Sequence, residues 1–476
     1  MAGLQKAGDF KIDSAKIITS AGIEIDISAS IIIITFFEDT GMMALSGNIL
    51  MFDTVNLASI GPLIGQEYLK LKISTPSFKD ESAIIDFTEN VFLIHSLQSR
   101  EKVGNRGQGY LLNFISSEVV KNQRTKVSQT LRGSYSEIVK NMLVNYINSK
   151  KDLYIERTSG SKKIISPNVR PFDVITMAMN ESISTHSKDP TYLFFETFKG
   201  YHFRSLTSMY VQKPLFTYTT HVPGSLWGRN RPGVIDIMKD LQNVIDYEIV
   251  SNSDIVVNYR TGVFASKLII HDIFNKEYTT HTYNYLDNFN KESHIDAGYG
   301  ERRHAKNYPM YSATPVERDG SRVSDFPART FVSSTSLKDT NLYTDSTHTT
   351  SLNTYPYAAF NPHQWLQRRT SQLIQLEQGI LINITVLGNT MLNSGDVVRL
   401  DIPYSGTQTT ENEKHDRFFK GMFFVKRIRH DFDISAGNKH TMHMTLVKDS
   451  VEDKLADSGL PEPKPKKGPL LYENFY

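Results

Sequence analysis

The sequence predicts a mainly β fold with an α+β region in its middle. Tyr and Phe are frequent, at 23 and 26 of the 476 residues, and both favour strands. Short apolar runs separated by turn residues occupy the two ends of the chain. Between them lie two stretches with helical periodicity, followed by an aromatic hairpin pattern.

Length and composition narrow the function. A chain of this length exceeds what one core usually serves, so several domains are expected. The 53 Lys plus Arg and 51 Asp plus Glu give a net charge of +2, which supplies no strong field to attract nucleic acid or an anionic membrane. The absence of Cys excludes disulfides, thiolate metal sites and thiol nucleophiles, and fits assembly in a reducing cytosol. We expect no signal peptide and no membrane insertion, because no window reaches roughly 18 to 20 apolar residues.

The first region is read as strands separated by turns. The run from Ile31 to Phe37 is apolar enough to be a strand buried on both faces. "GNRGQG" at 104–109 shares only its glycines with a phosphate-binding loop and lies between two strands, so a hairpin turn is the better interpretation. The predicted strands are Ile31–Phe37, Ala44–Phe52, Glu67–Ser74, Val91–Gln98 and Tyr110–Ile115.

The next region is predicted to be α+β. Apolar residues between 135 and 147 share one helical face, and Ser134 with Glu137 predicts a capping box. A second helix is expected to begin at Pro171. "YLFFETFKGYHFRSL" predicts a hairpin around Lys199 and Gly200. Such aromatic stripes are compatible with a ligand pocket, but a core of helices and hairpin is the simpler interpretation.

Strands are expected again beyond residue 211, at 214–220, 246–251 and 266–273, with a helix around 233–243. Residues 299–358 are polar and have almost no apolar periodicity, which predicts a functional loop or a segment that orders on a partner.

The last third returns to regular structure. The pattern predicts a helix over 361–379 with Gly379 as its cap. Strands dominate from 380 to 447, and the proline-punctuated residues 451–476 suggest an extended tail.

Two strand sets repeat one another. Gly65 opens "GQEYLKLKIS" as Gly395 opens "GDVVRLDIP", and similar strands follow each. Fourteen residues separate Leu97 from Leu111 and likewise Ile428 from Met442. This predicts two copies of one small β domain at opposite ends of the chain. Chance is the alternative, because antiparallel β domains share alternation and hairpin spacing.

A duplicated β domain has a geometric consequence. A homotrimer of such chains carries six similar barrels, so it presents a nearly sixfold ring on one side and a threefold surface on the other. Such an assembly would act as a symmetry adaptor.

Three features follow one another over about residues 10–450. They are "TFFEDTGMMALSGNILMFDTVNL" leading into "GQEYLKLKIS", the "YLFFETFKGYHFRSL" hairpin after two helices, and "GNTMLNSGDVVRLDIP" followed by "FFKGMFFVKRIRHDFDISAGNKHTMHMTLVKD". This succession resembles the central baseplate hub protein of contractile-tailed bacteriophages of the T-even type, a relative of the hub portion of the contractile secretion spike. The order of the features carries the resemblance, because the shared positions are mostly apolar or glycine.

The resemblance implies a homotrimeric ring of six tube-like antiparallel β-barrels, two per chain, with the second barrel split by an inserted α+β domain. The domains would be a first barrel at 1–117, a middle domain at 118–211 and 255–380, a second barrel at 212–254 and 381–450, and a tail at 451–476. The polar segment 299–358 departs from the family.

The partners follow from the same resemblance. The ring would receive the hexameric tail tube or its initiator proteins above and hold the trimeric, often lysozyme-bearing, spike below, beside inner baseplate proteins. DNA would pass through the channel without specific binding. The protein would be assembled in the host cytoplasm and reside in the virion tail baseplate.

Enzymatic chemistry is the rival class. His440 and His443 stand three apart on a strand and therefore face opposite sides, so they are interpreted as ordinary strand histidines rather than a metal pair. Asp431 and Asp433 share one strand face, as a glycosidase pair would, but nothing else in that strand supports the role. No G-x-S-x-G, H-E-x-x-H or Walker motif occurs.

One loop gathers hydrolase-like residues, namely His294, Asp296, Glu301 and His304, and solvated loop residues are the simpler interpretation. The basic pairs Lys162–Lys163, Arg302–Arg303 and Arg368–Arg369 are scattered, which favours solvated faces over nucleic-acid contacts. We therefore predict a non-enzymatic structural protein with no catalytic, cofactor-binding or metal-binding residues and no cofactor. The alternative is a carbohydrate-binding or cell-wall-degrading tail protein, suggested by the many tyrosines.

Overall fold

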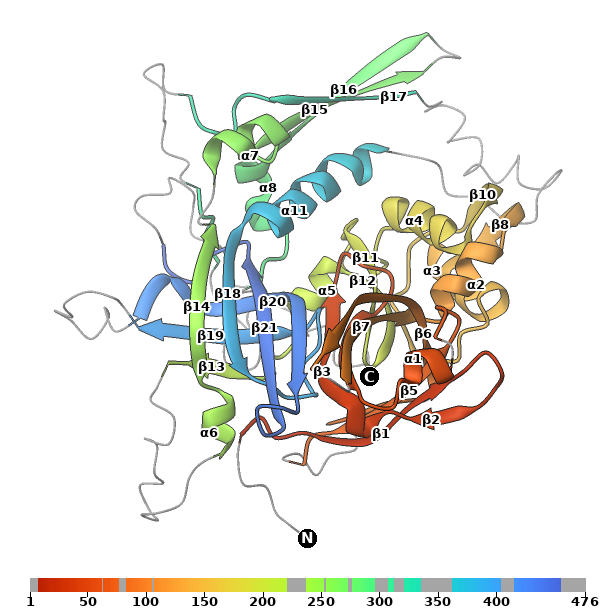
Figure 1. The fold of residues 1–476 in the computed structure, drawn as a ribbon. Coiled ribbons are helices and arrows are strands. Elements are labelled where there is room, and N and C mark those ends of the chain that lie inside the picture. The colour runs from red at the N-terminus through yellow and green to blue at the C-terminus, as the bar shows by residue number, and fades with distance from the viewer. Residues whose placement is uncertain are drawn as a thin grey trace.

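The computed structural model describes residues 7–61, 63–76, 83–104, 107–220, 237–251, 254–272, 276–295, 307–311, 321–334, 362–403 and 415–454. The architecture is mainly β, dominated by one large, strongly bent sheet with smaller α+β layers beside it (Figure 1). None of the helices described is long and apolar enough to cross a membrane.

The N-terminal strands form one half of the large sheet. Their order is β3-β4-β7-β6-β5-β1-β2, and every neighbouring pair is antiparallel. The isoleucine run is β3, and it supplies Ile34 and Phe36 to a fully buried core. The elements are β1 (Lys11–Ile18), β2 (Glu24–Asp26), β3 (Ile31–Asp39), β4 (Ser46–Asp53), α1 (Leu57–Ile60), β5 (Tyr68–Ser74), β6 (Ile84–Val103) and β7 (Gly107–Ser116).

The C-terminal strands form the other half, in the order β14-β18-β21-β20-β19-β13. A separate apolar core lies beneath them, with Ile382, Ile384, Leu400, Phe423 and Met444 among its members. The elements are β13 (Thr217–Thr219), α6 (Ile237–Leu241), β14 (Val244–Ser251), β18 (Ile380–Leu387), β19 (Val397–Pro403), β20 (His415–Asp433) and β21 (Lys439–Lys448).

The predicted repetition of strand order is confirmed. Strands β3-β4-β7-β6-β5, the first repeat, and β14-β18-β21-β20-β19, the second repeat, follow the same order along the chain and have the same antiparallel neighbours. Gly65 and Gly395, which open the equivalent strands β5 and β19, have φ of +88° and +89°. Glycine adopts a positive φ without steric cost and other residues do not, which explains why a glycine occupies both turns.

The register repeats as well. The ladder from β6 to β7 shifts between Ile94 and Ser96 and again between Gln98 and Glu101, and the ladder from β20 to β21 shifts between Val425 and Arg427 only. The first shift in β6 and the shift in β20 lie 331 positions apart, which is also the spacing of Leu97 and Ile428. Matching bulges at matching positions argue against chance similarity, since bulges are specific features of a fold.

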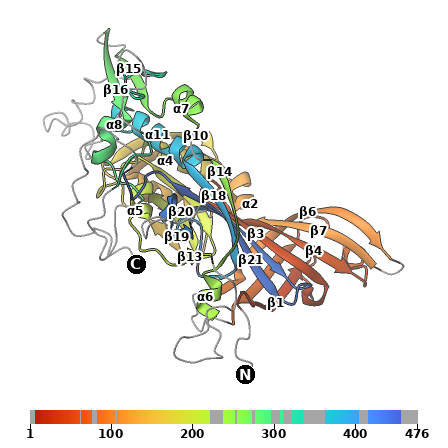
Figure 2. The same cartoon turned by 90° about the vertical axis from the view of Figure 1, so that its left-hand side faces the viewer.

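The two repeats are joined edge to edge. Strand β20 pairs antiparallel with β3, which makes a single thirteen-stranded sheet. Figure 2 shows the N-terminal strands extending from the C-terminal ones as a continuous curved surface. Two separately closed barrels were expected, but within the residues described no pairing closes either set, because the outer edge of β3 is taken by β20 and that of β14 by no strand. The strands flanking the repeats also differ, since β1 is antiparallel to β5 and β13 is parallel to β19.

The first α+β region has the predicted helices and hairpin. Ser134 and Glu137 form the expected capping box, and Pro171 lies in the first turn of α4. Tyr192, Phe194, Tyr201 and Phe203 of the hairpin are buried against the helices, as the core interpretation requires. The elements are α2 (Glu118–Arg124), β8 (Val127–Gly133), α3 (Tyr135–Asn141), a π-helix (Met142–Tyr146), β9 (Leu153–Ile155), β10 (Lys162–Val169), α4 (Pro171–Glu181), β11 (Tyr192–Thr197), β12 (Gly200–Ser205) and α5 (Leu206–Tyr210).

The second α+β region interrupts the second repeat between β14 and β18. A three-stranded sheet, β16-β15-β17, projects from the body, and α11 lies between it and the large sheet (Figure 1). The elements are α7 (Ile255–Thr261), β15 (Ala265–Asp272), β16 (Glu277–Asn284), α8 (Tyr285–Asn288), a 3-10 turn (Phe289–Lys291), β17 (Arg329–Ser334), a second 3-10 turn (Pro362–Gln364) and α11 (Leu366–Gln378).

The polar segment 299–358 contains regular structure, contrary to the expectation from its sequence. It includes β17, which pairs in parallel with β15. The short run of Phe331 and Val332 among polar residues is too brief to give a periodic signal. Most of the rest of this segment, and the tail from 455, lie outside the described residues.

Candidate functional site

Within the two repeats, two strand edges of the large sheet are open among the residues described. Among the residues described, β14 pairs only with β18, so its other edge has no partner strand. Strand β6 pairs with β5 only as far as Leu93, so the edge from Ser96 to Val103 is open on that side. Open edges present unpaired backbone donors and acceptors, which proteins usually cover, shorten or pair with another chain.

The repeat shows what each open edge lacks. Paired residues form a row across four strands in each repeat, and the two rows are equivalent. In the first repeat the row is Leu97, Leu112, Ile49 and Ile34; in the second it is Ile428, Met444, Ile384 and Tyr247. The first repeat's row ends on β3, and the second's ends on β14.

Equivalent positions at these row ends differ in exposure. Ile34 and Phe36 of β3 are 0% exposed, whereas Tyr247 and Ile249 of β14 are 37% and 43% exposed. β20 packs alongside β3 and places Phe432 opposite Ile34 and His430 opposite Phe36, whereas no strand of the described residues packs alongside β14. The core-facing side of β14 therefore leaves apolar surface exposed to water. Covering that surface would gain about 25 cal/mol of free energy per Å² buried.

The junction between β20 and β3 is held mainly by aromatic packing. Phe432 lies edge-on to Phe10, with ring centroids 5.1 Å apart, and to Phe36, at 6.0 Å. On the opposite, polar face, Arg427 Nε lies 2.6 Å from Asp39 Oδ2, and the Thr35 hydroxyl donates to Asp431. A strand pair with an apolar side and a polar side is a complete interface between two repeats.

Glu38 ties this junction to the hairpin of the middle region. Its carboxyl accepts hydrogen bonds from the backbone N–H of Phe198, at 3.0 Å, and of Ser394, at 2.8 Å. Burial raises the pKa of Glu38 to about 8, against the lowering effect of these two donors. One side chain of the first repeat thus contacts both the hairpin and the glycine turn of the second repeat.

A buried ion-pair cluster joins the first repeat to the middle region elsewhere. Lys151 Nζ lies 2.8 Å from Glu118 Oε2 and 2.6 Å from Glu196 Oε1. Glu196 also accepts from the N–H of Leu45 and the hydroxyl of Ser116. Every partner is buried, so this cluster fixes the relative position of the two parts.

The strand residues considered for chemistry have structural roles. His440 is 0% exposed and His443 is 44% exposed by side chain, so the two face opposite sides as predicted. Asp431 accepts from Thr35, Arg429 and His443, and these donors lower its pKa against the opposing effect of burial. A carboxylate held ionised in this way is unsuited to act as a general acid.

The loop candidates do not assemble into a site. His294 is buried between Asp449, with Nδ1 2.9 Å from Oδ2, and the carbonyl of Phe289, 2.8 Å from Nε2. It is thus a buried structural residue rather than the solvated loop residue expected. Asp296, Glu301 and His304 lie outside the described residues.

The remaining sequence candidates are also accounted for. "GNRGQG" is a hairpin connection, with Val103 paired to Gly107 and residues 105 and 106 not described. Lys162 packs on the ring of Tyr135, Lys163 is exposed, and Arg302–Arg303 are not described. A solvated position is wrong for Arg369, which is 6% exposed and donates to the carbonyl of Tyr192. The described part of the chain contains no group of three or more His, Asp or Glu positioned to hold a metal ion.

Comparison with known proteins gives structural likeness at low identity. No family model and no curated protein sequence matches. A tail protein from Neisseria meningitidis MC58 is 11% identical, with a TM-score of 0.49 over 93% of this chain and 97% of that one. The 43 kDa tail protein of prophage MuSo2 from Shewanella oneidensis is 9% identical, with a TM-score of 0.49 over 92% and 98%. A chain of the lidded Francisella PdpA–VgrG complex is 12% identical, with a TM-score of 0.40 over 97% and 55%. At these values the function has to be argued from the chain's own geometry.

Proposed function

We propose that this protein is the central hub of a contractile phage tail baseplate, a homotrimeric ring in which the junction seen within the chain recurs between chains. One observation carries the proposal: the open edges of β6 and β14 are the equivalents of two strands that pair with each other inside the chain. Strand β20 pairs with β3; β6 is the equivalent of β20, and β14 is the equivalent of β3.

The proposed contact follows by transferring the junction from one repeat to the other. Within the chain, Asp431 lies opposite Thr35. Through the common partners in each repeat, Glu101 of β6 is the equivalent of Asp431, and Glu248 of β14 is the equivalent of Thr35. Glu101 of one copy would therefore face Glu248 of the next, in an antiparallel strand pair.

This contact covers what the single chain leaves open. Tyr247 and Ile249 would be packed as Ile34 and Phe36 are, and the exposed edge of β6 would gain a ladder. Because the contact is head-to-tail and uses two different edges, it closes into a ring when the rotation allows. Three chains with two repeats each give the sixfold arrangement, and closure of the ring provides the barrel that a single chain lacks.

The ring accounts for the partners proposed from the sequence resemblance. Six similar repeats offer a hexameric tail tube or its initiator proteins a matching surface on one side. The threefold surface on the other side offers a seat for a trimeric spike, and inner baseplate proteins would surround both. DNA would pass through the opening without specific binding, the protein would reside in the virion tail, and it would have no enzymatic role.

The test is the mass of the purified protein in solution. Three chains of 54.1 kDa give about 162 kDa by light scattering. Ile249→Asp should convert the trimer to monomer while keeping the fold, because Ile249 is 43% exposed within one chain. Val332→Asp, at a 72% exposed residue of β17, is the matched control and should remain trimeric. A wild-type monomer, or a trimer unaffected by Ile249→Asp, would contradict the proposal.

A further inference from the structure

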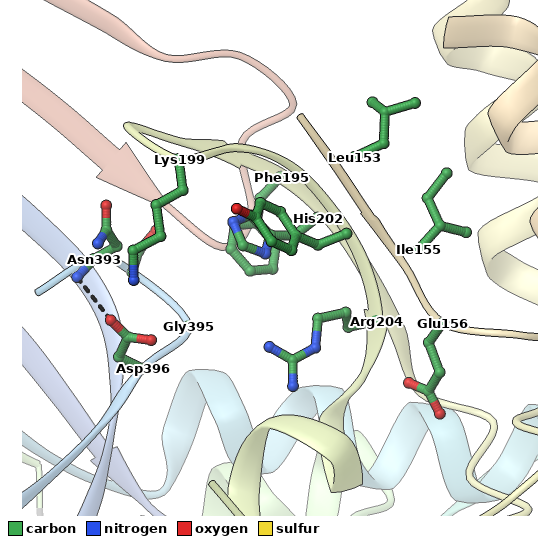
Figure 3. A pocket seen from close by; sticks show the side chains of 12 residues that line it. Leu153, Ile155, Glu156, Phe195, Lys199, His202, Arg204, Asn393, Gly395 and Asp396 are labelled. Atoms are coloured by element: carbon green, nitrogen blue, oxygen red, sulfur yellow. Dashed lines mark hydrogen bonds between the residues drawn. The ribbon is translucent and has the colours of Figure 1, made fainter. Parts of the chain in front are cut away.

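A cavity lies where the hairpin β11–β12 meets the glycine turn of the second repeat. It has a volume of about 180 Å³ and is bounded by β9, the hairpin and the turn at Asn393–Asp396. Figure 3 shows Lys199 and Arg204 directed from the hairpin toward the turn, with His202 between them. The residues of the open strand edges do not line this cavity, although Ser394 on its wall donates to Glu38 of the junction.

The equivalent turn of the first repeat is built differently, so the strand order alone does not produce the cavity. The first repeat makes the equivalent turn at Gly65, where the carboxylate of Glu67 accepts from the N–H groups of Ile64, Gly65 and Gln66. In the second repeat the acid is Asp396, one carbon shorter, which accepts from Asn393 N at 2.9 Å. The hairpin covers this second turn, with Phe195 so close to Gly395 that an added Cβ would lie 2.7 Å from its ring.

Both cations of the cavity act electrostatically on the carboxyl of Asp396, but at a distance beyond that of a close ion pair. Neither Lys199 nor Arg204 forms an ion pair among the residues described. Arg204 donates to Gln212 Oε1 and to the carbonyl of Ser208, which leaves further N–H groups of its guanidinium. Glu156, also on the wall, already accepts from Ser184 Oγ and Ser205 N, and Figure 3 shows it directed away from the two cations.

His202 adds a neutral donor. Its ring is stacked between Tyr154, at 4.7 Å, and Phe195, at 5.0 Å, which fixes its orientation. Nε2 lies 3.0 Å from the hydroxyl of Thr197, which already accepts from the N–H of Lys199. The Thr197 hydroxyl has no other acceptor among the residues described, so it donates to Nε2 and leaves Nδ1 protonated. Burial lowers the pKa of His202 well below its usual range, so the ring remains neutral.

We propose that this cavity binds an oxyanion, a carboxylate or phosphate group, between Arg204, Lys199 and the Nδ1–H of His202. Guanidinium and ammonium groups form their strongest hydrogen bonds with such anions. Asp396 also lines the cavity; burial raises its pKa, and the charges of Lys199 and Arg204 act to lower it. A small molecule and the free carboxyl terminus of a peptide both present such a group.

Calorimetric titration of the full chain tests the proposal. The probes are inorganic phosphate, citrate, and a tetrapeptide as its free acid and as its amide, all at constant ionic strength. We expect saturable binding of at least one oxyanion, weakened at least tenfold in Arg204→Gln and in Lys199→Gln. Arg132→Gln and Lys439→Gln, at exposed positions elsewhere, are the matched controls and should bind as the wild type does.

The results distinguish a small-molecule anion from a peptide carboxyl terminus as the ligand. Binding of phosphate or citrate assigns the site to a small molecule, and binding of the free acid but not the amide assigns it to a chain terminus. No saturable binding, or binding equal in both variants, would overturn the proposal. If Arg204→Gln does not fold, Lys199→Gln decides, because Lys199 lies exposed at the hairpin turn. Ile249→Asp should bind as tightly as wild type, so this result is independent of ring formation.

Discussion

Asp39 and Arg427 form an ion pair across the two repeats, with 2.6 Å between Oδ2 and Nε. The Arg427 side chain is 52% exposed, so water screens the pair. Five residue pairs along the same ladder, Phe432 lies opposite Ile34 and is fully buried against Phe10 and Phe36. We therefore expect the aromatic packing to supply most of the stability of the junction, and the ion pair mainly to fix which residues of β3 and β20 face each other.

Substitutions at the two faces of the junction should differ in cost. Asp39→Asn should lower the free energy of unfolding by less than about 1 kcal/mol, because the pair is solvent-screened. Phe432→Ala should lower it by about 3 to 5 kcal/mol, because it removes a buried ring and leaves a cavity. Urea titrations of the two variants measure both values. Equal costs would show that the ion pair, rather than the packing, holds the repeats together.

Glu38 should make stability depend on pH near neutrality. Its folded pKa of about 8 lies above the ordinary value of 4.5, so its contribution is fully present below pH 4.5 and is lost as pH rises through 8. At about 1.4 kcal/mol per unit, the loss between pH 6 and 8 is on the order of 2 kcal/mol. Asp396, whose charge raises this pKa, and Lys199, whose charge lowers it, are the ionisable groups that act on Glu38.

Glu38→Gln is the variant that isolates this effect. The amide oxygen of the variant can accept from one of the two N–H groups, of Phe198 and Ser394, but its amide nitrogen cannot accept from the other. One buried N–H group therefore loses its partner, and at pH 6 the variant should be less stable than wild type by roughly 1 to 3 kcal/mol. The gap should narrow toward pH 8, where the wild type pays for ionising a buried carboxyl. Thermal unfolding at a series of pH values follows the difference, and a gap that stays constant would refute the assignment.

The Lys151 cluster should be costly to break from one side. Lys151→Ala leaves Glu118 and Glu196 buried without their cation, and this should lower the free energy of unfolding by about 3 to 5 kcal/mol. Lys16→Ala is the matched control, because the pair of Lys16 with Glu24 is exposed and is worth less than about 1 kcal/mol. Urea titration measures both losses. Equal losses would mean that the buried cluster stabilises the fold no more than the exposed pair does.

The glycine turn of the second repeat should tolerate no side chain. Gly395→Ala forces a Cβ to 2.7 Å from the Phe195 ring at a φ of +89°, so both crowding and backbone strain apply. Gly22→Ala shares the positive φ, +81°, but has nothing within 4 Å, and should cost only about 1 kcal/mol. Melting temperatures compare the two, and a Gly395→Ala variant as stable as Gly22→Ala would show that the hairpin yields.

Strand periodicity was sufficient to predict much of the fold from the sequence. The apolar alternation around Leu71 and Leu400 and the positive-φ glycines at 65 and 395 identify the repeat, because strand faces and tight turns leave direct marks in sequence. The sequence did not predict which edges remain open. Tyr247 and Ile249 alternate like any half-buried strand, and only the partner strand decides whether they are covered. Glu38 was likewise missed, since an acid ending an apolar run is usually a boundary, and its two backbone donors lie 160 and 356 positions away.

Cross-linking between the two open edges tests the central claim most directly. The natural chain has no cysteine, so Glu101→Cys with Glu248→Cys introduces a single defined pair. If β6 of one copy pairs with β14 of the next, mild oxidation should give covalent dimers and trimers on a denaturing gel, since facing strand residues lie within disulfide range. Glu101→Cys with Ile165→Cys, at an exposed residue of β10, should give none. A monomeric band from the first pair under conditions where the protein is trimeric would contradict the account.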